Sequence, residues 1–88
     1  MAKSMQIKLK LFMRFKEYLP ESGEDGIAQH EIADNSTFKD LLNDIGMPIE
    51  EDKIIVINGV SHKQGEEANA LQLKNNDTVA IFPPIAGG

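Results

Sequence analysis

A single short amphipathic helix is the feature that most constrains how this chain folds. Four apolar residues recur at the i, i+3, i+4, i+7 spacing that gathers side chains on one helical face: Phe38, Leu41, Leu42 and Ile45. Thr37 can cap the first turn, with Asp40 three residues later as a capping-box partner, and Gly46 is a natural helix stop. Because a helix of this length is not stable alone, its apolar stripe must pack against a sheet.

Strand patterns lie on both sides of this helix. Residues 6–12 alternate, with Ile7, Leu9 and Leu11 pointing one way, and residues 27–32 form a second, weaker strand. A short helical turn and a polar, glycine-bearing loop separate the two segments. We therefore expect an antiparallel hairpin with a wide connection.

After the helix, residues 53–58 contain four consecutive β-branched residues. This run predicts a strand that is buried on both faces or sits centrally in the sheet. Asn58-Gly59 supplies tight-turn chemistry, because both residues tolerate positive φ. We expect residues 60–63 to return as a short strand, residues 64–74 to be irregular, and residues 78–82 to form the last strand.

The order strand, strand, helix, strand, short strand, strand predicts an α+β fold. A hairpin followed by a crossover helix implies a mixed sheet of four to five strands, with one main helix across one face. This is the β-grasp, or ubiquitin-like, arrangement. The 88 residues suffice for one small domain, which we assign to residues 1–82, and we expect residues 83–88 to form a flexible diglycine tail.

Composition and charge argue against several classes of function. The chain has no cysteine, which excludes a disulfide scaffold, a thiolate metal site and a cysteine nucleophile. The formal net charge of −5 argues against nucleic-acid binding and, by steering alone, favours a partner with a basic docking surface. The apolar runs are too short to cross a membrane and no signal-peptide pattern is present, so we expect a cytoplasmic protein.

The side chains offer no enzyme centre. His30 and His62 lack metal-ligand spacing, so we expect no metal site. The acidic clusters at residues 50–52 and 66–67 are typical of solvated loops rather than of calcium or general-acid sites. No serine has the context of a nucleophile elbow, and no glycine-rich phosphate loop is present. We therefore expect a non-catalytic protein.

The last residues, Gly87-Gly88, point to chemistry at the terminus itself. They place a carboxylate on a stem without side chains, which a narrow channel can admit. A partner must first activate such a carboxylate, for example as a mixed anhydride with AMP, because its charge resists nucleophilic attack. Ile85 and Ala86 could line the partner's channel, and Pro83-Pro84 stiffens the exit from the last strand.

Strand parity predicts an apolar patch beside this tail. If Leu11 faces the helix, Phe12 faces away from it, and if Ile81 faces the helix, Phe82 faces away. In a β-grasp sheet the two strands are neighbours. The two phenylalanines would then form an exposed apolar surface of the kind that marks a protein interface.

Several motifs together resemble the MoaD/ThiS family of small sulfur-carrier proteins. They are the ending FPPIAGG, the strand NNDTVAI before it, the opening IKLKLFMRFKEYLP, the single capped helix and the INGV hairpin, and the resemblance spans residues 5–88. It implies a carrier without a bound cofactor. A ubiquitin-activating-like adenylyltransferase would use ATP to join Gly88 to AMP. Sulfur from a donor such as a cysteine desulfurase or rhodanese would then give a thiocarboxylate.

The Phe-Pro-Pro motif favours the MoaD branch, whose tail enters the large subunit of molybdopterin synthase and delivers sulfur to the pterin precursor. Carried over here, Gly88 bears the thiocarboxylate, Gly87 is the stem, and Phe12, Val60 and Phe82 lie in the docking surface. Sulfur transfer to the thiamin thiazole or in another pathway stays open, as does ubiquitin-like conjugation to lysines through Gly88. A passive binding module with an incidental tail is the third alternative.

Overall fold

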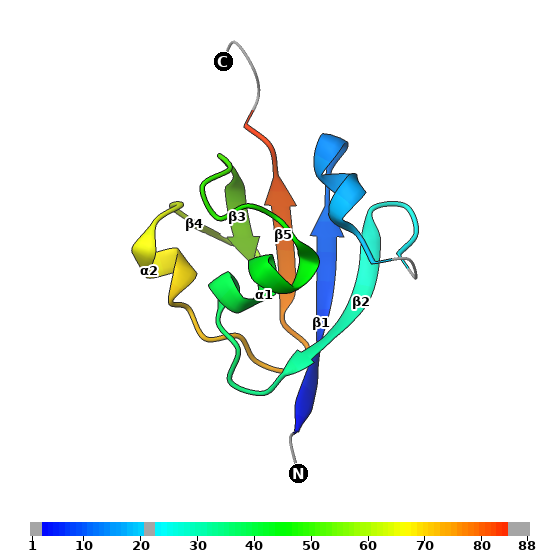
Figure 1. Ribbon diagram of the computed structural model, residues 1–88, viewed down its shortest axis with the longest axis vertical. Helices are drawn as coiled ribbons and strands as arrows, with labels where there is room; N and C mark the ends of the chain where they lie inside the picture. The colour runs from blue at the N-terminus through cyan, green and yellow to red at the C-terminus, as the bar shows by residue number, and fades with distance from the viewer. Residues whose placement is uncertain (1–2, 21–22, 85–88) are drawn as a thin grey trace.

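The predicted helix and strands assemble into one layer of sheet covered on one side by helix. A computed structural model describes residues 3–20 and 23–84. Its strands form a sheet in the order β2-β1-β5-β3-β4 (Figure 1). The strands are β1 (Ser4–Leu11), β2 (Ile27–Ala33), β3 (Ile54–Ile57), β4 (Val60–His62) and β5 (Thr78–Phe82). The helices are the 3-10 helix η1 (Met13–Tyr18), α1 (Phe38–Ile45) and α2 (Glu66–Asn69).

The pairing of the strands confirms the predicted β-grasp arrangement. β1 pairs antiparallel with β2 and parallel with β5, and β5 continues antiparallel to β3, which pairs antiparallel with β4. The sheet is therefore mixed, and α1 crosses one of its faces (Figure 1). Because β1 and β5 are parallel, both strands end at the same edge of the molecule, where η1 also lies.

The ends of α1 form as their residue types predict. Thr37 Oγ1 accepts a hydrogen bond from the Asp40 backbone N–H at 3.2 Å, and the Asp40 carboxylate accepts one from the Thr37 N–H at 2.9 Å. This reciprocal capping box satisfies two N–H groups that have no partner within the helix. Gly46 ends the helix in the left-handed conformation, with a φ of 83°.

The core lies between α1 and the covered face of the sheet. The apolar residues of α1 pack there against alternate residues of β1, β3 and β5. The largest fully buried side chains are Phe15, Phe38, Ile7, Leu9, Leu11, Leu41, Leu42, Met47, Ile55, Ile81 and Val79. We refer to this side as the helix face, and to the opposite side of the sheet as the open face.

Three expectations from the sequence need correction or extension. The predicted irregular stretch contains α2, a single helical turn that is too short to show a periodic apolar pattern. β1 begins two residues earlier than predicted, at Ser4. β3 does lie inside the sheet, between β5 and β4, but it is not buried on both faces, because Ile54 is 43% exposed on the open face.

Candidate functional site

Two aromatic rings stack on the open face at the end of β5. Lys10 pairs with Ala80 and Leu11 with Ile81 in the parallel ladder, so the next residues, Phe12 and Phe82, come side by side. Their ring centroids lie 4.2 Å apart with only 4° between the ring planes. Leu11 and Ile81 are fully buried on the helix face, so the predicted parity of Phe12 and Phe82 is confirmed. The two rings are half-buried, however, and not exposed as we expected.

Further apolar side chains extend this stack across the sheet. The strand register places Ile54 of β3 opposite Phe82 and Val56 opposite Ala80, whereas Ile27 of β2 pairs with Lys10. Ile27 and Ile54 are 45% and 43% exposed. We call the following group the open-face patch: Phe12, Ile27, Ile54, Val56, Ala80 and Phe82. A contiguous apolar surface on one side of a small domain is typical of a protein interface.

The predicted tail begins at this patch. Pro83 is buried and Pro84 is exposed, so the chain leaves the end of β5 directly beside Phe82. Ile85, Ala86, Gly87 and Gly88 lie outside the described residues. Their roles in a partner's channel stay predictions.

Val60 lies apart from the patch. It is 58% exposed, but it pairs with Ile57, which points into the core, so its side chain is directed to the helix side of the sheet. Directly opposite residues in a ladder project from the same face. The structure therefore brings Phe12 and Phe82 together but does not bring Val60 to them.

The two histidines lie in different surroundings. His30 Nε2 contacts the carboxylate of Asp44, which ties β2 to α1, and the His30 side chain is 16% exposed. His62 lies in the edge strand β4. Within residues 3–20 and 23–84, no group of histidine and carboxylate side chains is arranged to hold a metal ion.

A buried lysine beneath the acidic loop is the feature that the sequence did not reveal. Lys53 is 5% exposed, and its Nζ donates hydrogen bonds to the carbonyl oxygens of Pro48 at 3.3 Å, Ile49 at 3.0 Å and Glu51. Burial lowers the pKa of Lys53 by desolvation, and the neighbouring carboxylates of residues 50–52 oppose this shift. Only a lysine directly after three acids hinted at this role in the sequence.

Gln64 and η1 hold the same loop from two further directions. Gln64 Nε2 donates to the carbonyl oxygen of Glu51 at 2.9 Å, while its Oε1 accepts from the Lys53 N–H at 3.0 Å. The Glu51 carboxylate contacts Arg14 at 3.4 Å and accepts a hydrogen bond from the Tyr18 hydroxyl at 3.2 Å. Residues 48–53 therefore form an ordered acidic loop rather than a freely solvated one.

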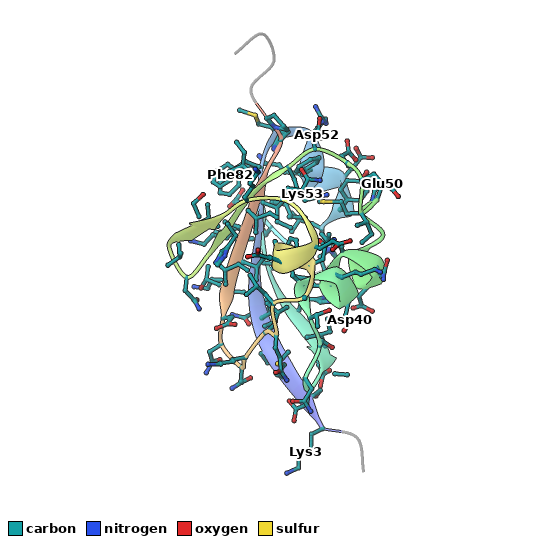
Figure 2. The ribbon with its side chains drawn as sticks, turned by 90° about the vertical axis from the view of Figure 1, so that its left-hand side faces the viewer. Lys3, Asp40, Glu50, Asp52, Lys53 and Phe82 are labelled. Atoms are coloured by element: carbon teal, nitrogen blue, oxygen red, sulfur yellow. The ribbon has the colours of Figure 1, made fainter. Side chains whose placement is uncertain are left out.

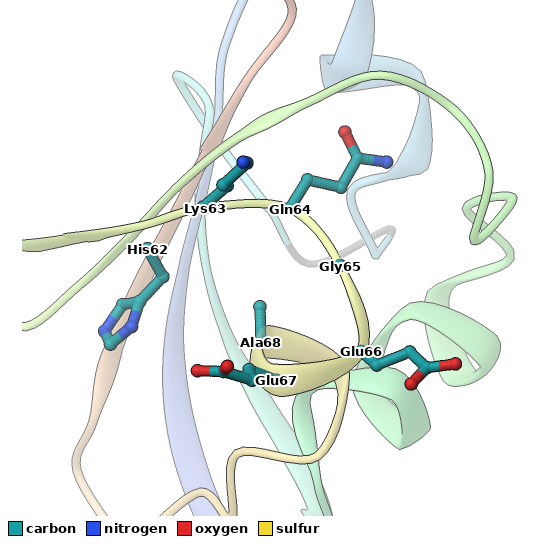
Figure 3. A pocket seen from close by; sticks show the side chains of 7 residues that line it. All are labelled: His62, Lys63, Gln64, Gly65, Glu66, Glu67 and Ala68. Carbon is teal, nitrogen blue, oxygen red and sulfur yellow. The ribbon is translucent and has the colours of Figure 1, made fainter.

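A pocket of about 500 Å³ lies where β4 leads into α2, lined by residues 62–68. In Figure 3 the side chain of Glu66 points to the opposite side from those of Glu67 and His62. The titratable groups of the lining therefore do not all converge on one point. In the described ranges, no helix has the length and apolarity needed to span a bilayer.

Solved structures of other proteins share this fold. The Haloferax volcanii HVO 2177 protein matches with a TM-score of 0.70 at 24% identity, over 97% of this chain and 88% of that chain. A Pyrococcus furiosus protein described as a "putative molybdopterin converting factor, subunit 1" matches with a TM-score of 0.67 at 22% identity, over 92% and 99% of the two chains. SAMP1 from Haloferax volcanii gives 0.62 at 20% identity, over 94% and 99%.

At these identities the structural likeness establishes the fold alone. A comparison with curated protein sequences gave no significant match. The ThiS family, however, matches residues 10–88, a range that includes both stacked phenylalanines and the diglycine. The chain therefore belongs to the ThiS family.

Proposed function

We propose that the protein carries sulfur as a thiocarboxylate on Gly88, and that the open-face patch docks it on the enzymes that load and unload the tail. The observation that carries this proposal is the Phe12–Phe82 stack at the end of β5, in a chain of the ThiS family. Six residues follow Phe82, and Gly88 is the sixth. An extended segment of that length reaches roughly 20 Å, enough to enter a partner's active site while the patch is bound.

The proposed chemistry proceeds in balanced steps. The Gly88 carboxylate attacks the α-phosphorus of ATP on a partner enzyme, which gives an acyl-adenylate and releases pyrophosphate. The terminal sulfur of a donor persulfide then attacks the acyl carbon and displaces AMP. A thiol reductant cleaves the resulting acyl disulfide, which leaves the thiocarboxylate on the carrier and returns the donor as a thiol or disulfide.

For the acceptor, we propose the molybdopterin precursor bound to a synthase large subunit. The Phe-Pro-Pro motif supports this choice, and the fold is also that of the Pyrococcus furiosus protein described above. Sulfur transfer to the thiamin thiazole uses the same activated glycine and is the alternative within this function.

A second candidate function is conjugation to protein lysines through Gly88. The fold likeness to SAMP1, which covers 94% of this chain, favours this candidate. SAMP1 from Methanosarcina acetivorans, described as a small archaeal modifier protein, also shares the fold, with a TM-score of 0.59 at 23% identity. An isopeptide bond would form when a lysine amine, rather than sulfur, attacks the acyl-adenylate.

The absence of cysteine makes the first experiment simple. After incubation with an adenylating enzyme, ATP and a sulfur source, a thiol-reactive label can attach only to a thiocarboxylate. Exchange of oxygen for sulfur adds about 16 Da, as methionine oxidation does, so the label distinguishes the two. We expect one label on the wild-type chain and none on a chain without Gly88. No label on a wild-type chain that forms the acyl-adenylate would contradict sulfur carriage.

Two assays then separate the acceptors. Thiocarboxylated carrier that has not been treated with the label should yield molybdopterin when it is mixed with the large subunit and precursor, and thiazole formation in its place would shift the assignment to the alternative pathway. Because Lys74 is the last residue at which trypsin can cleave, residues 75–88 would remain attached to a modified lysine after digestion. Cellular lysines that carry this remnant, dependent on Gly88, would establish conjugation.

A further inference from the structure

Positive charge lies on one side of the Phe12–Phe82 stack on the open face, although the chain as a whole is acidic. Lys10 lies two residues before Phe12, between Ile27 and Ala80, and Lys8 pairs with Thr78 two residues further from the stack. Both lysines alternate with the buried residues of β1, so they project from the open face. The acid of this face, Glu31, pairs with Gln6 at the far end of the sheet and contacts the Ser4 hydroxyl.

Negative charge borders the patch on its other side, where the tail leaves. Asp52 is exposed in the acidic loop and lies two residues before Ile54, the cross-strand partner of Phe82. Figure 2 shows Asp52 at the end of the molecule where β5 ends, close to the top of the sheet, whereas Glu50 lies on the helix side, away from Phe82. Because Lys53 and Gln64 hydrogen-bond to the loop backbone, the Asp52 carboxylate is presented in a defined place.

Along the direction of β5, the open face therefore presents first the two lysines, then the Phe12–Phe82 stack, and then Asp52. We propose that the adenylating partner recognises this order with carboxylates facing Lys8 and Lys10, an apolar pocket for the Phe12–Phe82 stack, and a basic group facing Asp52 at the mouth of its ATP site. This inference rests on the proposed function and names the chemistry of its docking partner.

The physical basis is orientation. An apolar patch alone can be bound in several rotations, and only one of them directs Gly88 into the active site. Charges of opposite sign at the two borders make a reversed orientation repulsive at both ends, and they also steer the encounter. Basic groups at the mouth suit a site that must hold ATP and a carboxylate together, since both are anionic. Net charge alone predicts a uniformly basic partner surface, whereas the placement of charges predicts a surface of two signs.

The test measures ATP–pyrophosphate exchange by the adenylating enzyme from the same genome, with the full chain as the varied substrate. Lys8→Glu and Lys10→Glu reverse the sign of the charge at the first border, and Lys39→Glu on the exposed side of α1 is the matched control. Asp52→Lys reverses the sign of the charge at the second border, and Glu67→Lys on α2 is its control. Circular dichroism and urea unfolding establish that each variant is folded.

We expect each border variant to raise KM about three- to tenfold at low salt with kcat unchanged, because rim charges act mainly on association. This difference should shrink toward about 1 M salt, where the Debye length is about 3 Å. The controls should keep the wild-type KM within about twofold. Border variants that match their controls at either border would overturn the inference while the proposed function stands. Absence of exchange with the wild-type chain would overturn both.

Discussion

Two neighbouring isoleucines of β3 show how differently the two faces of the sheet are used. Ile55 is fully buried in the core on the helix face, whereas Ile54 is 43% exposed on the open face beside Phe82. Both residues favour a strand equally, and one peptide bond separates them. The comparison teaches that burial in the core accounts for the apolar residues on one face only, and the proposed docking role would account for those on the other.

The largest effect should come from the helix face. Ile55→Ala removes buried methyl groups and leaves a cavity, so the free energy of unfolding should fall by about 2 to 5 kcal/mol. Urea denaturation followed by circular dichroism measures this loss. Because such a loss could unfold a domain of this size, Ile55→Val offers a milder variant, with an expected loss of about 0.5 to 1.5 kcal/mol. If both variants were as stable as the wild type, burial of Ile55 on the helix face would not contribute to folding, and the contrast with Ile54 would not hold.

A smaller loss is expected at Lys53, where the buried group is polar. Lys53→Met keeps the apolar stem but removes the ammonium group that donates to three backbone carbonyls. We expect the free energy of unfolding to fall by about 1 to 3 kcal/mol, the typical cost of buried polar groups left without a partner. Lys39→Met, at an exposed position of α1, is the control and should change little. Equal effects at the two positions would contradict a structural role for the lysine.

The same lysine predicts a pH dependence with a definite sign. Because burial lowers the pKa of Lys53 in the folded chain, the unfolded chain binds more protons between that lowered pKa and 10.5. Stability from this group therefore rises with pH across that window. Tyr18 acts in the opposite direction, since burial and Glu51 raise its pKa above 10.0 and its contribution is lost at higher pH. Subtracting the free energy of unfolding of Lys53→Met from that of the wild type removes the contribution of Tyr18, because both chains contain it. We expect this difference to increase toward pH 10.5.

Local sequence signals predicted those parts of the fold that neighbouring residues determine. Thr37, Asp40 and Gly46 act within a few residues of α1, and the structure shows the predicted cap and stop. The positive φ values of Asn58 and Gly59, 52° and 82°, likewise belong to the turn itself. Strand alternation also placed Phe12 and Phe82 on the open face, because parity is a local property.

Sequence signals were less informative where the environment comes from distant segments. Four β-branched residues correctly predicted that β3 lies inside the sheet, but they could not show that α1 covers only one face and leaves Ile54 exposed. The hydrogen bonds that hold Lys53 depend on Gln64, eleven residues away, and on how the loop before β3 folds back. The family resemblance placed Val60 in the docking surface, and only its register with Ile57 shows that it faces the other side.

The smallest effect on stability should be at Ile54, and this makes it the sharpest test of the comparison. Ile54→Ala shortens a side chain that solvent already reaches, so we expect the free energy of unfolding to change by less than about 0.5 kcal/mol. On the proposed docking surface the same truncation should weaken partner binding by about 1 kcal/mol or more, since apolar residues near the centre of an interface carry much of its energy. We therefore expect Ile54→Ala to be defective in pyrophosphate exchange but stable, and Ile55→Val to be less stable but normal in exchange. If Ile54→Ala instead lost stability and kept its KM, the open face would be an extension of the core and docking would have to lie elsewhere.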